Sequence, residues 1–241
     1  MCWRTVVAAS LTGACWTAVV VAQRTDVFVA SRDHPAIQYS NAPANDAVTR
    51  LNRQLADGTA HLTLQGPSGY LSAALRALEV PIESQVAVFS QTSNQAKLIN
   101  ARNPRAIFFN DATAIGWVRG GTVLEVATHD SRQGVIFYTL DQTVDRPQFR
   151  RDNSCLECHL TWDTLGVPGM FVLSTLQRPD ENAYAGGFVA DHMSPFADRW
   201  GGWYVTGRTG AVRHAGNTAM LKTEESAFPL RSPRESLASL D

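Results

Sequence analysis

The chain has few cysteines: four in 241 residues, of which Cys2 and Cys15 lie in the first 22 positions. Beyond those positions only Cys155 and Cys158 remain, which excludes a disulfide framework for the body of the chain. The sequence also lacks a second C-x-x-C and any H-x3-H pair, so a zinc site of the usual spacing is excluded. Four uses remain for Cys155 and Cys158: attachment of a haem, a redox-active dithiol, half of a metal site or one short disulfide.

The sequence also has no excess of charge of either sign. Its formal net charge is −1, its pI is near 6.6, and its charged residues are dispersed rather than gathered in runs. The sequence therefore lacks the cluster of basic residues by which proteins bind nucleic acid or an anionic membrane surface. With 44% hydrophobic residues and six tryptophans, the chain can nevertheless bury a substantial core.

What the sequence does contain is the pentapeptide Cys155-Leu156-Glu157-Cys158-His159, a C-x-x-C-H pattern. Two thiols at this spacing can add to the two vinyl groups of one haem, and the adjacent imidazole then becomes the proximal ligand of the iron. The pattern therefore predicts one covalent haem c, held by Cys155 and Cys158, with His159 on the iron.

The residues around Cys155 and Cys158 favour haem attachment over a disulfide, a redox-active dithiol or a zinc site. A disulfide across so short a loop constrains the unfolded chain little. A thioredoxin-like dithiol would follow a β-strand, whereas the polar segment 150–154 precedes this pair and predicts a loop. Zinc would need two further ligands at a suitable spacing.

Residues 1–22 have the features of an export signal. Arg4 is followed by an apolar run at 5–22, and Val20 and Ala22 present small residues at the −3 and −1 positions of a cleavage site. We expect cleavage and a periplasmic or otherwise exported protein. An uncleaved membrane anchor and a lipid-modified Cys15 are the alternatives.

The rest of the chain predicts a linker, one haem-binding domain and a flexible tail, at 23–45, 46–220 and 221–241. Asn45 or Asp46 can cap a helix that ends at Gly58, and a second helix is expected at about 68–78. Short β segments follow, joined by Gly, Asn and Pro turns, and they predict an antiparallel meander. These strands are expected at 86–89, 106–109, 113–118, 123–128 and 135–140.

A short helix is expected to carry the C-x-x-C-H motif, with a polar residue of 152–154 at its N-cap. Further strands are predicted at 170–173, 184–189, 202–206 and 211–214. The fold class is therefore α+β, with two N-terminal helices, a meander, a haem-bearing helix and more strands. It differs from the common small all-α cytochrome c fold, in which the motif lies near the N-terminus.

Just over half of the chain, about 85–217, resembles a family of exported, single-haem bacterial proteins that contain a cytochrome c domain. The resemblance is carried by RDNSCLECH at 151–159, RWGGWYVTG at 199–207, NPRAIFFND at 103–111 and the segments 88–93, 137–142, 166–169, 191–192 and 194–196. It implies haem binding and export but no particular reaction. This chain departs from the family at Ala215, where Met is common, and in stopping at Asp241.

The motif does not assign the sixth ligand of the iron. His192, which follows Asp191, is the first distal candidate because a carboxylate can orient an imidazole. His214 is the second and Met170 the third, and the distal position can also be open. Arginines that could pair with haem propionates are Arg151, Arg199, Arg208 and Arg213.

Three functions compete on this evidence. The first is a periplasmic electron carrier or electron-transfer domain that works with redox partner proteins. The second is a haem enzyme or gas sensor with an open distal site. The third is an exported binding domain without haem, in which Cys155 and Cys158 form a disulfide. No other catalytic constellation is visible, so the first is favoured over a stand-alone enzyme.

Overall fold

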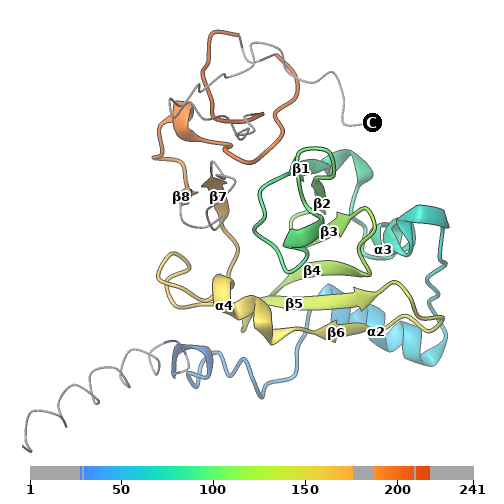
Figure 1. Cartoon of the computed structure of the whole chain (residues 1–241). Helices are drawn as coiled ribbons and strands as arrows, with labels where there is room; N and C mark the ends of the chain where they lie inside the picture. The colour runs from blue at the N-terminus through green and yellow to red at the C-terminus, as the bar shows by residue number, and fades with distance from the viewer. Residues whose placement is uncertain (1–27, 29, 176–186, 209, 218–241) are drawn as a thin grey trace, which may run out of the picture.

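The computed structural model describes residue 28 and residues 30–175, 187–208 and 210–217 (Figure 1). Its centre is a six-stranded antiparallel sheet whose strands follow one another in sequence order, so the predicted meander is confirmed. The strands are β1 (Val86–Val88), β2 (Arg105–Phe109), β3 (Thr113–Val118), β4 (Val123–Asp130), β5 (Gly134–Asp141) and β6 (Phe149–Arg151).

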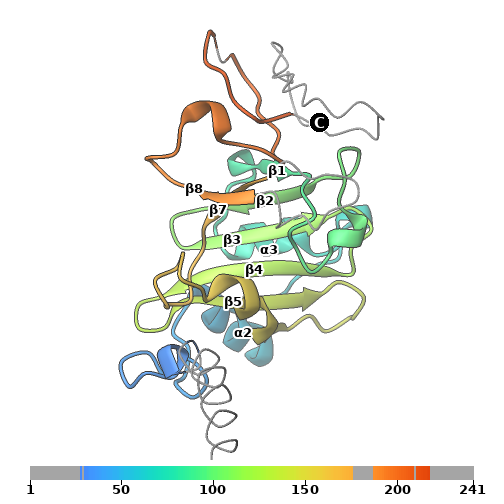
Figure 2. The ribbon, with the colours of Figure 1, turned by 60° about the vertical axis from the view of Figure 1, so that its left-hand side comes forward.

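Two helices, α2 (Ala47–Asp57) and α3 (Leu71–Ala77), cover one face of this sheet, as Figures 1 and 2 show together. Strand residues that face them, such as Leu124, Ile136 and Leu140, are fully buried. Both helices and an antiparallel sheet are present, so the α+β class is confirmed and the all-α cytochrome fold is absent from the described residues.

Helix α2 forms where the sequence predicted it. The Asp46 carboxylate accepts a hydrogen bond from the Thr49 main-chain N–H and so satisfies one of the unpaired donors of the first turn. Val48 and Leu51 are buried against the sheet, and Gly58 ends the helix with φ 78°.

Helix α3 begins three residues later than expected. The residues Gly66–Ser68 form a separate 3-10 turn, and Gly69, at φ 62°, breaks the helical path. An added Cβ at Gly69 would meet only the flexible amide of Gln142, so the positive φ is the reason that glycine is favoured here. The apolar stripe of α3 is buried as expected, since both Leu71 and Leu75 lie in the core.

Strand β6 was missed, because the sequence predicted a polar loop at 150–154. Its three residues pair with β5, Leu140 opposite Phe149 and Tyr138 opposite Arg151. Edge strands tolerate charged residues. Two successive arginines therefore do not exclude a strand at this position.

After the motif the chain forms a second, two-stranded sheet of β7 (Val172–Thr175) and β8 (Gly187–Ala190). The strands predicted at 202–206 and 211–214 are wrong. Trp203 makes only an isolated bridge to Val88, next to Gly202 at φ 81° and Trp200 at φ 75°. Positive φ values at two positions interrupt the extended backbone that a strand needs.

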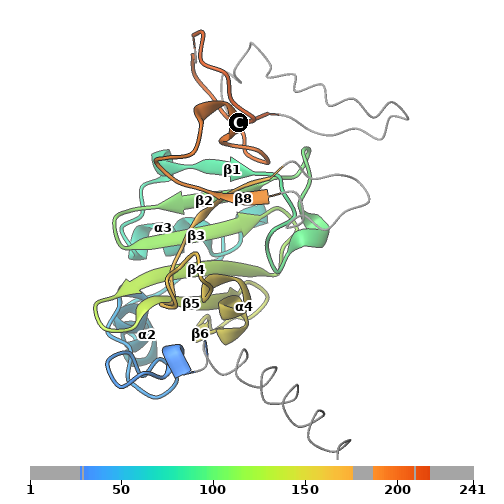
Figure 3. The same cartoon turned by 90° about the vertical axis from the view of Figure 1, so that its left-hand side faces the viewer.

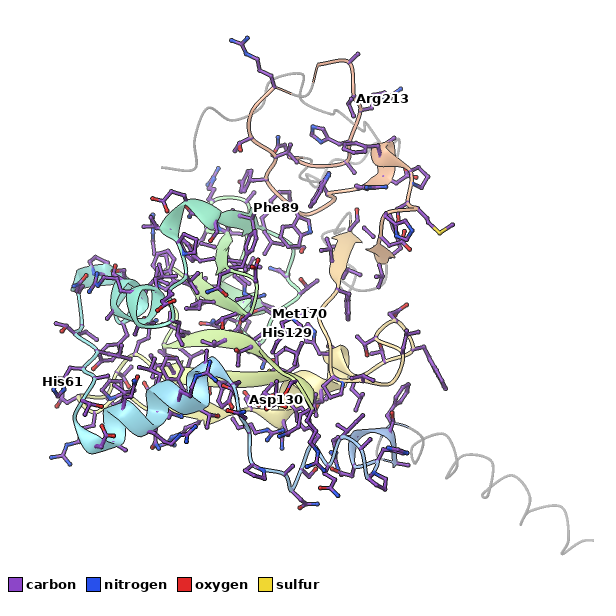
Figure 4. The ribbon with its side chains drawn as sticks, turned by 180° about the vertical axis from the view of Figure 1, so that it is seen from behind. His61, Phe89, His129, Asp130, Met170 and Arg213 are labelled. Atoms are coloured by element: carbon purple, nitrogen blue, oxygen red, sulfur yellow. The ribbon has the colours of Figure 1, made fainter. Side chains whose placement is uncertain are left out.

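The predicted linker at 23–45 is wrong for the part that the structure describes. Tyr39 is fully buried in the core, and the Asn45 N–H donates to the Asp130 carboxylate over 2.7 Å. Figure 4 places Asp130 beside the start of α2. The polar composition of the segment concealed one anchoring aromatic residue.

The predicted signal peptide at 1–22 and the tail at 221–241 lie outside the described residues. Within the described ranges no helix is both long and apolar enough to cross a membrane.

Candidate functional site

The segment that carries the motif is fastened at both ends to the outer edge of β5. The Asp152 N–H donates to the Phe137 carbonyl over 2.9 Å, and the Val135 N–H donates to the Pro168 carbonyl over 2.8 Å. Between these bonds the chain leaves the sheet edge. Figures 2 and 3 show it on the face of the sheet opposite to α2 and α3. The motif therefore rests on a rigid support.

Within that segment a 3-10 turn (Asn153–Cys155) runs directly into α4 (Leu156–His159), as the sequence predicted. The Asp152 carboxylate caps the turn by accepting from the Ser154 N–H over 3.0 Å. Residues three apart lie on the same side of a helical turn, so Cys155 and Cys158 share one side. Leu156 is 7% exposed and fixes the opposite side to the core.

His159 is held by a main-chain acceptor. Its Nδ1 lies 2.9 Å from the Gly169 carbonyl oxygen, and the Gly169 N–H in turn donates to the His159 carbonyl over 3.0 Å. A carbonyl oxygen can only accept, so Nδ1 is the protonated nitrogen. The lone pair then resides on Nε2, which is the arrangement found in histidines that bind metals.

The imidazole of His159 is neutral at neutral pH. Burial is the main reason that its pKa lies below the ordinary value, and the hydrogen bond to Gly169 only partly opposes that effect. Two aromatic rings flank it, Phe137 at 4.6 Å and Phe171 at 5.4 Å between ring centroids. A neutral ring in an aromatic enclosure is ready to donate Nε2 to a metal.

Cys155 is a free thiol in the structure. Burial, followed by the charges of Asp152 and Glu125, raises its pKa to about 12. Redox-active C-x-x-C motifs work with thiols of depressed pKa, so this environment argues against a thioredoxin-like role.

An ion pair lies on the same face of the sheet. Arg105 Nη2 of β2 is 2.7 Å from Glu125 Oε2 of β4, and the two side chains are 21% and 13% exposed. They meet across Gly116 of β3, where an added Cβ would lie 2.6 Å from the guanidinium. Ser93 donates to the other oxygen of Glu125 over 3.1 Å.

His192, the first of the predicted distal ligands, lies two residues beyond the end of β8. It lines a cavity of about 280 Å³ together with Val172 and Trp200. Val172 directly follows Phe171, which contacts His159, so β7 links the motif to this cavity. Asp191 Oδ1 accepts from the Met193 and Ser194 N–H groups of its own turn, which lowers the pKa of this carboxyl, and the charge of His192 is a minor cause of the same shift.

His214 lies next to the same segment, since the Ala215 N–H donates to the carbonyl of Arg199, which also lines that cavity. The His214 side chain is 5% exposed, and its Nδ1 accepts from the Gly216 N–H over 3.0 Å. In Figures 1 and 3 the segment 196–217 lies beyond β1, at the end of the sheet opposite to α4. The structure therefore does not bring His214 to the motif.

Met170 lies on the proximal side. It stands between Gly169 and Phe171, both of which contact His159, and its side chain is 44% exposed. A distal ligand must approach the iron from the side opposite to His159. The position of Met170, labelled in Figure 4, therefore disfavours it as the sixth ligand.

Of the four propionate partners expected from the sequence, Arg151 and Arg199 are engaged elsewhere, and Arg208 and Arg213 are exposed. Arg151 donates to the Tyr39 carbonyl over 2.7 Å and lies over the Tyr39 ring, on the helix side of the sheet. Arg199 donates to the Ser194 and His192 carbonyls. Figure 4 shows Arg213 in the segment beyond β1.

No protein-family model, curated protein or solved structure matches this chain. The case for a function therefore rests on the site itself.

The sequence pattern pointed to the three motif residues but not to the residues that contact them in the structure. Phe137, Phe171 and Gly169 reach His159 from other elements, and Arg105 and Glu125 meet across a third strand. One signal was available: Arg105 and Glu125 are charged residues inside strands that are otherwise largely apolar.

Proposed function

We propose that this protein is an exported c-type cytochrome with one haem, which acts in electron transfer with redox partner proteins. The haem would be bound through thioethers at Cys155 and Cys158, with His159 as the proximal iron ligand. The observation that carries the proposal is the bond from His159 Nδ1 to the Gly169 carbonyl. It leaves the lone pair on Nε2, in a histidine that directly follows the second of two cysteines on the same helical side.

The donor set fits this group. Covalent attachment of haem requires two thiols and a neutral imidazole, and the motif supplies all three. When bound, haem supplies reversible one-electron chemistry at its iron. The chain contributes a rigid frame, because the segment that carries α4 is tied to β5 on both sides and the rings of Phe137 and Phe171 pack on the imidazole.

We propose His192 as the distal residue, since its side chain is exposed, whereas His214 is buried with its Nδ1 bound to the Gly216 N–H and Met170 lies on the proximal side. The His192 imidazole is exposed at the cavity beside β7. Ligation by His192 supports electron transfer through a six-coordinate iron. An iron without this ligand would bind small molecules and would support the haem enzyme or gas sensor instead.

The test is expression of the full chain, with its N-terminal segment, in a host that has a functional haem-maturation system. We expect the mass to increase by one haem and the reduced protein to show a c-type spectrum. The matched control is Cys155→Ser with Cys158→Ser, which leaves the fold and removes both attachment points. A colourless wild-type protein whose two cysteines form a disulfide would overturn the proposal and favour a binding domain without haem.

Carbon monoxide then separates electron transfer from ligand chemistry. We expect the reduced wild-type protein to resist it and His192→Ala to bind it, because the variant opens the sixth position. Rapid binding by the wild type would contradict the electron-transfer proposal.

A further inference from the structure

The ion pair of Arg105 and Glu125 is incompletely satisfied. The Nε atom of Arg105 is buried and has no hydrogen-bond acceptor among the described residues. Neither polar atom of the Gln95 amide, on the loop of Ser93, has a partner in the described part of the chain. Buried polar atoms without partners are rare in folded proteins, and a bound polar group is one explanation for them.

Three contacts place this pair beside the motif. Ser93 donates to Glu125, and its neighbour Asn94 lies 3.5 Å from the hydroxyl of Ser154, which precedes Cys155. Glu125 is opposite Thr139 in the sheet, so the diagonal neighbour on its face is Phe137, whose ring packs on His159. A group attached at Cys155 is therefore within reach of the pair.

We propose that Arg105, positioned by Glu125 over Gly116, binds a propionate carboxylate of the haem. This inference rests on the proposed function. A guanidinium presents five donors in a planar fork that suits a carboxylate, and Glu125 uses only part of them. Glu125 is the positioning residue, since it holds the guanidinium flat across the strand between them.

The charge arrangement has a consequence that can be measured. Without the cation, the propionate charge and the Glu125 charge are uncompensated near the iron, and both favour the ferric state. Arg105→Gln therefore lowers the midpoint potential. Glu125→Gln raises it, because the cation then loses its counter-charge. We expect each change to alter the reduction equilibrium constant roughly threefold to tenfold; tenfold is about 59 mV for one electron.

The experiment compares the midpoint potentials of the haem-loaded wild type, Arg105→Gln, Glu125→Gln and Arg53→Gln. Arg53 is an exposed arginine of α2 on the opposite face of the sheet, so its variant removes the same charge far from the motif. We expect opposite shifts for the first two variants and none for Arg53→Gln. Arg105→Lys keeps the charge but not the fork, so it retains most of the potential while shifting the propionate carboxylate band in redox-difference infrared spectra.

This inference is overturned if haem-loaded Arg105→Gln has the same midpoint potential and the same carboxylate band as the wild type. That result would leave the proposed function intact. If Arg105→Gln does not fold, Glu125→Gln replaces it as the test. A midpoint potential of Glu125→Gln that is lower than that of the wild type, or unchanged, would also overturn this inference and leave the proposed function intact. Absence of haem from the wild type would instead refute the proposed function itself, and this inference with it.

Discussion

The two faces of the central sheet differ in how completely the chain covers them. On the helix face, Leu124 and Ile136 are fully buried, and the Tyr138 hydroxyl donates to Asp46 over 2.7 Å. On the motif face, Arg105 retains an unsatisfied buried donor, and Trp162 and Leu165 near the motif are 72% and 89% exposed. Arg151 Nε on the helix face is also buried without an acceptor among the described residues, so the two faces differ in the exposure of their side chains rather than in how completely their polar groups are satisfied.

The largest expected effect is on the helix face. Leu124→Ala should lower the free energy of unfolding by about 2–5 kcal/mol, because it removes a fully buried side chain and leaves a cavity. Leu165→Ala on the motif face is the matched control and should change it by less than about 0.5 kcal/mol. Urea denaturation measures both. Equal losses would remove the contrast between the faces.

Asp46→Ala tests the polar contacts of the helix face. The variant loses the cap of α2 and leaves the Tyr138 hydroxyl without its buried acceptor. We expect a loss of about 1–2 kcal/mol in the free energy of unfolding. Asp57→Ala, at the exposed end of the same helix, is the control and should have little effect. A loss no larger than that of the control would contradict the assigned role of Asp46.

Gly116→Ala tests the packing of the Arg105 side chain on the motif face. An added Cβ would lie 2.6 Å from the Arg105 guanidinium, so the side chain must move and the pair with Glu125 must weaken. Because a flexible side chain can yield, we expect a loss of only about 1 kcal/mol. The haem-loaded variant should also show the lower potential expected for Arg105→Gln. A wild-type potential would mean that the guanidinium does not have to lie over Gly116.

The smallest effect is a pH dependence from His159. Burial lowers its pKa in the folded state below the value of 6.5 expected for the unfolded chain. The unfolded chain therefore binds more protons, and the free energy of unfolding falls as the pH drops below about 6.5. Urea denaturation of the haem-free protein between pH 7.5 and 5 measures this slope. His159→Gln should flatten it, whereas the exposed control His61→Gln should leave it unchanged.

Local signals predicted much of this fold. The Asp46 cap and Gly58 define α2 because both act within one helical turn of its ends. The apolar runs of β2 to β5 and the glycine turns between them placed those strands to within about two residues. The same reasoning failed at β6, whose arginines are tolerated because it is an edge strand, and at 202–206, where Gly202 takes a positive φ two residues after Trp200 does.

The sequence by itself determined the chemistry of the motif, since Cys155, Cys158 and His159 lie within one helical turn and their spacing is a local property. Only the tertiary structure decided which nitrogen of His159 is free, since that depends on the Gly169 carbonyl ten residues later. The meeting of Arg105 and Glu125 across an intervening strand likewise depends on sheet register. Such contacts join residues distant in sequence, and no short pattern specifies which of them will meet.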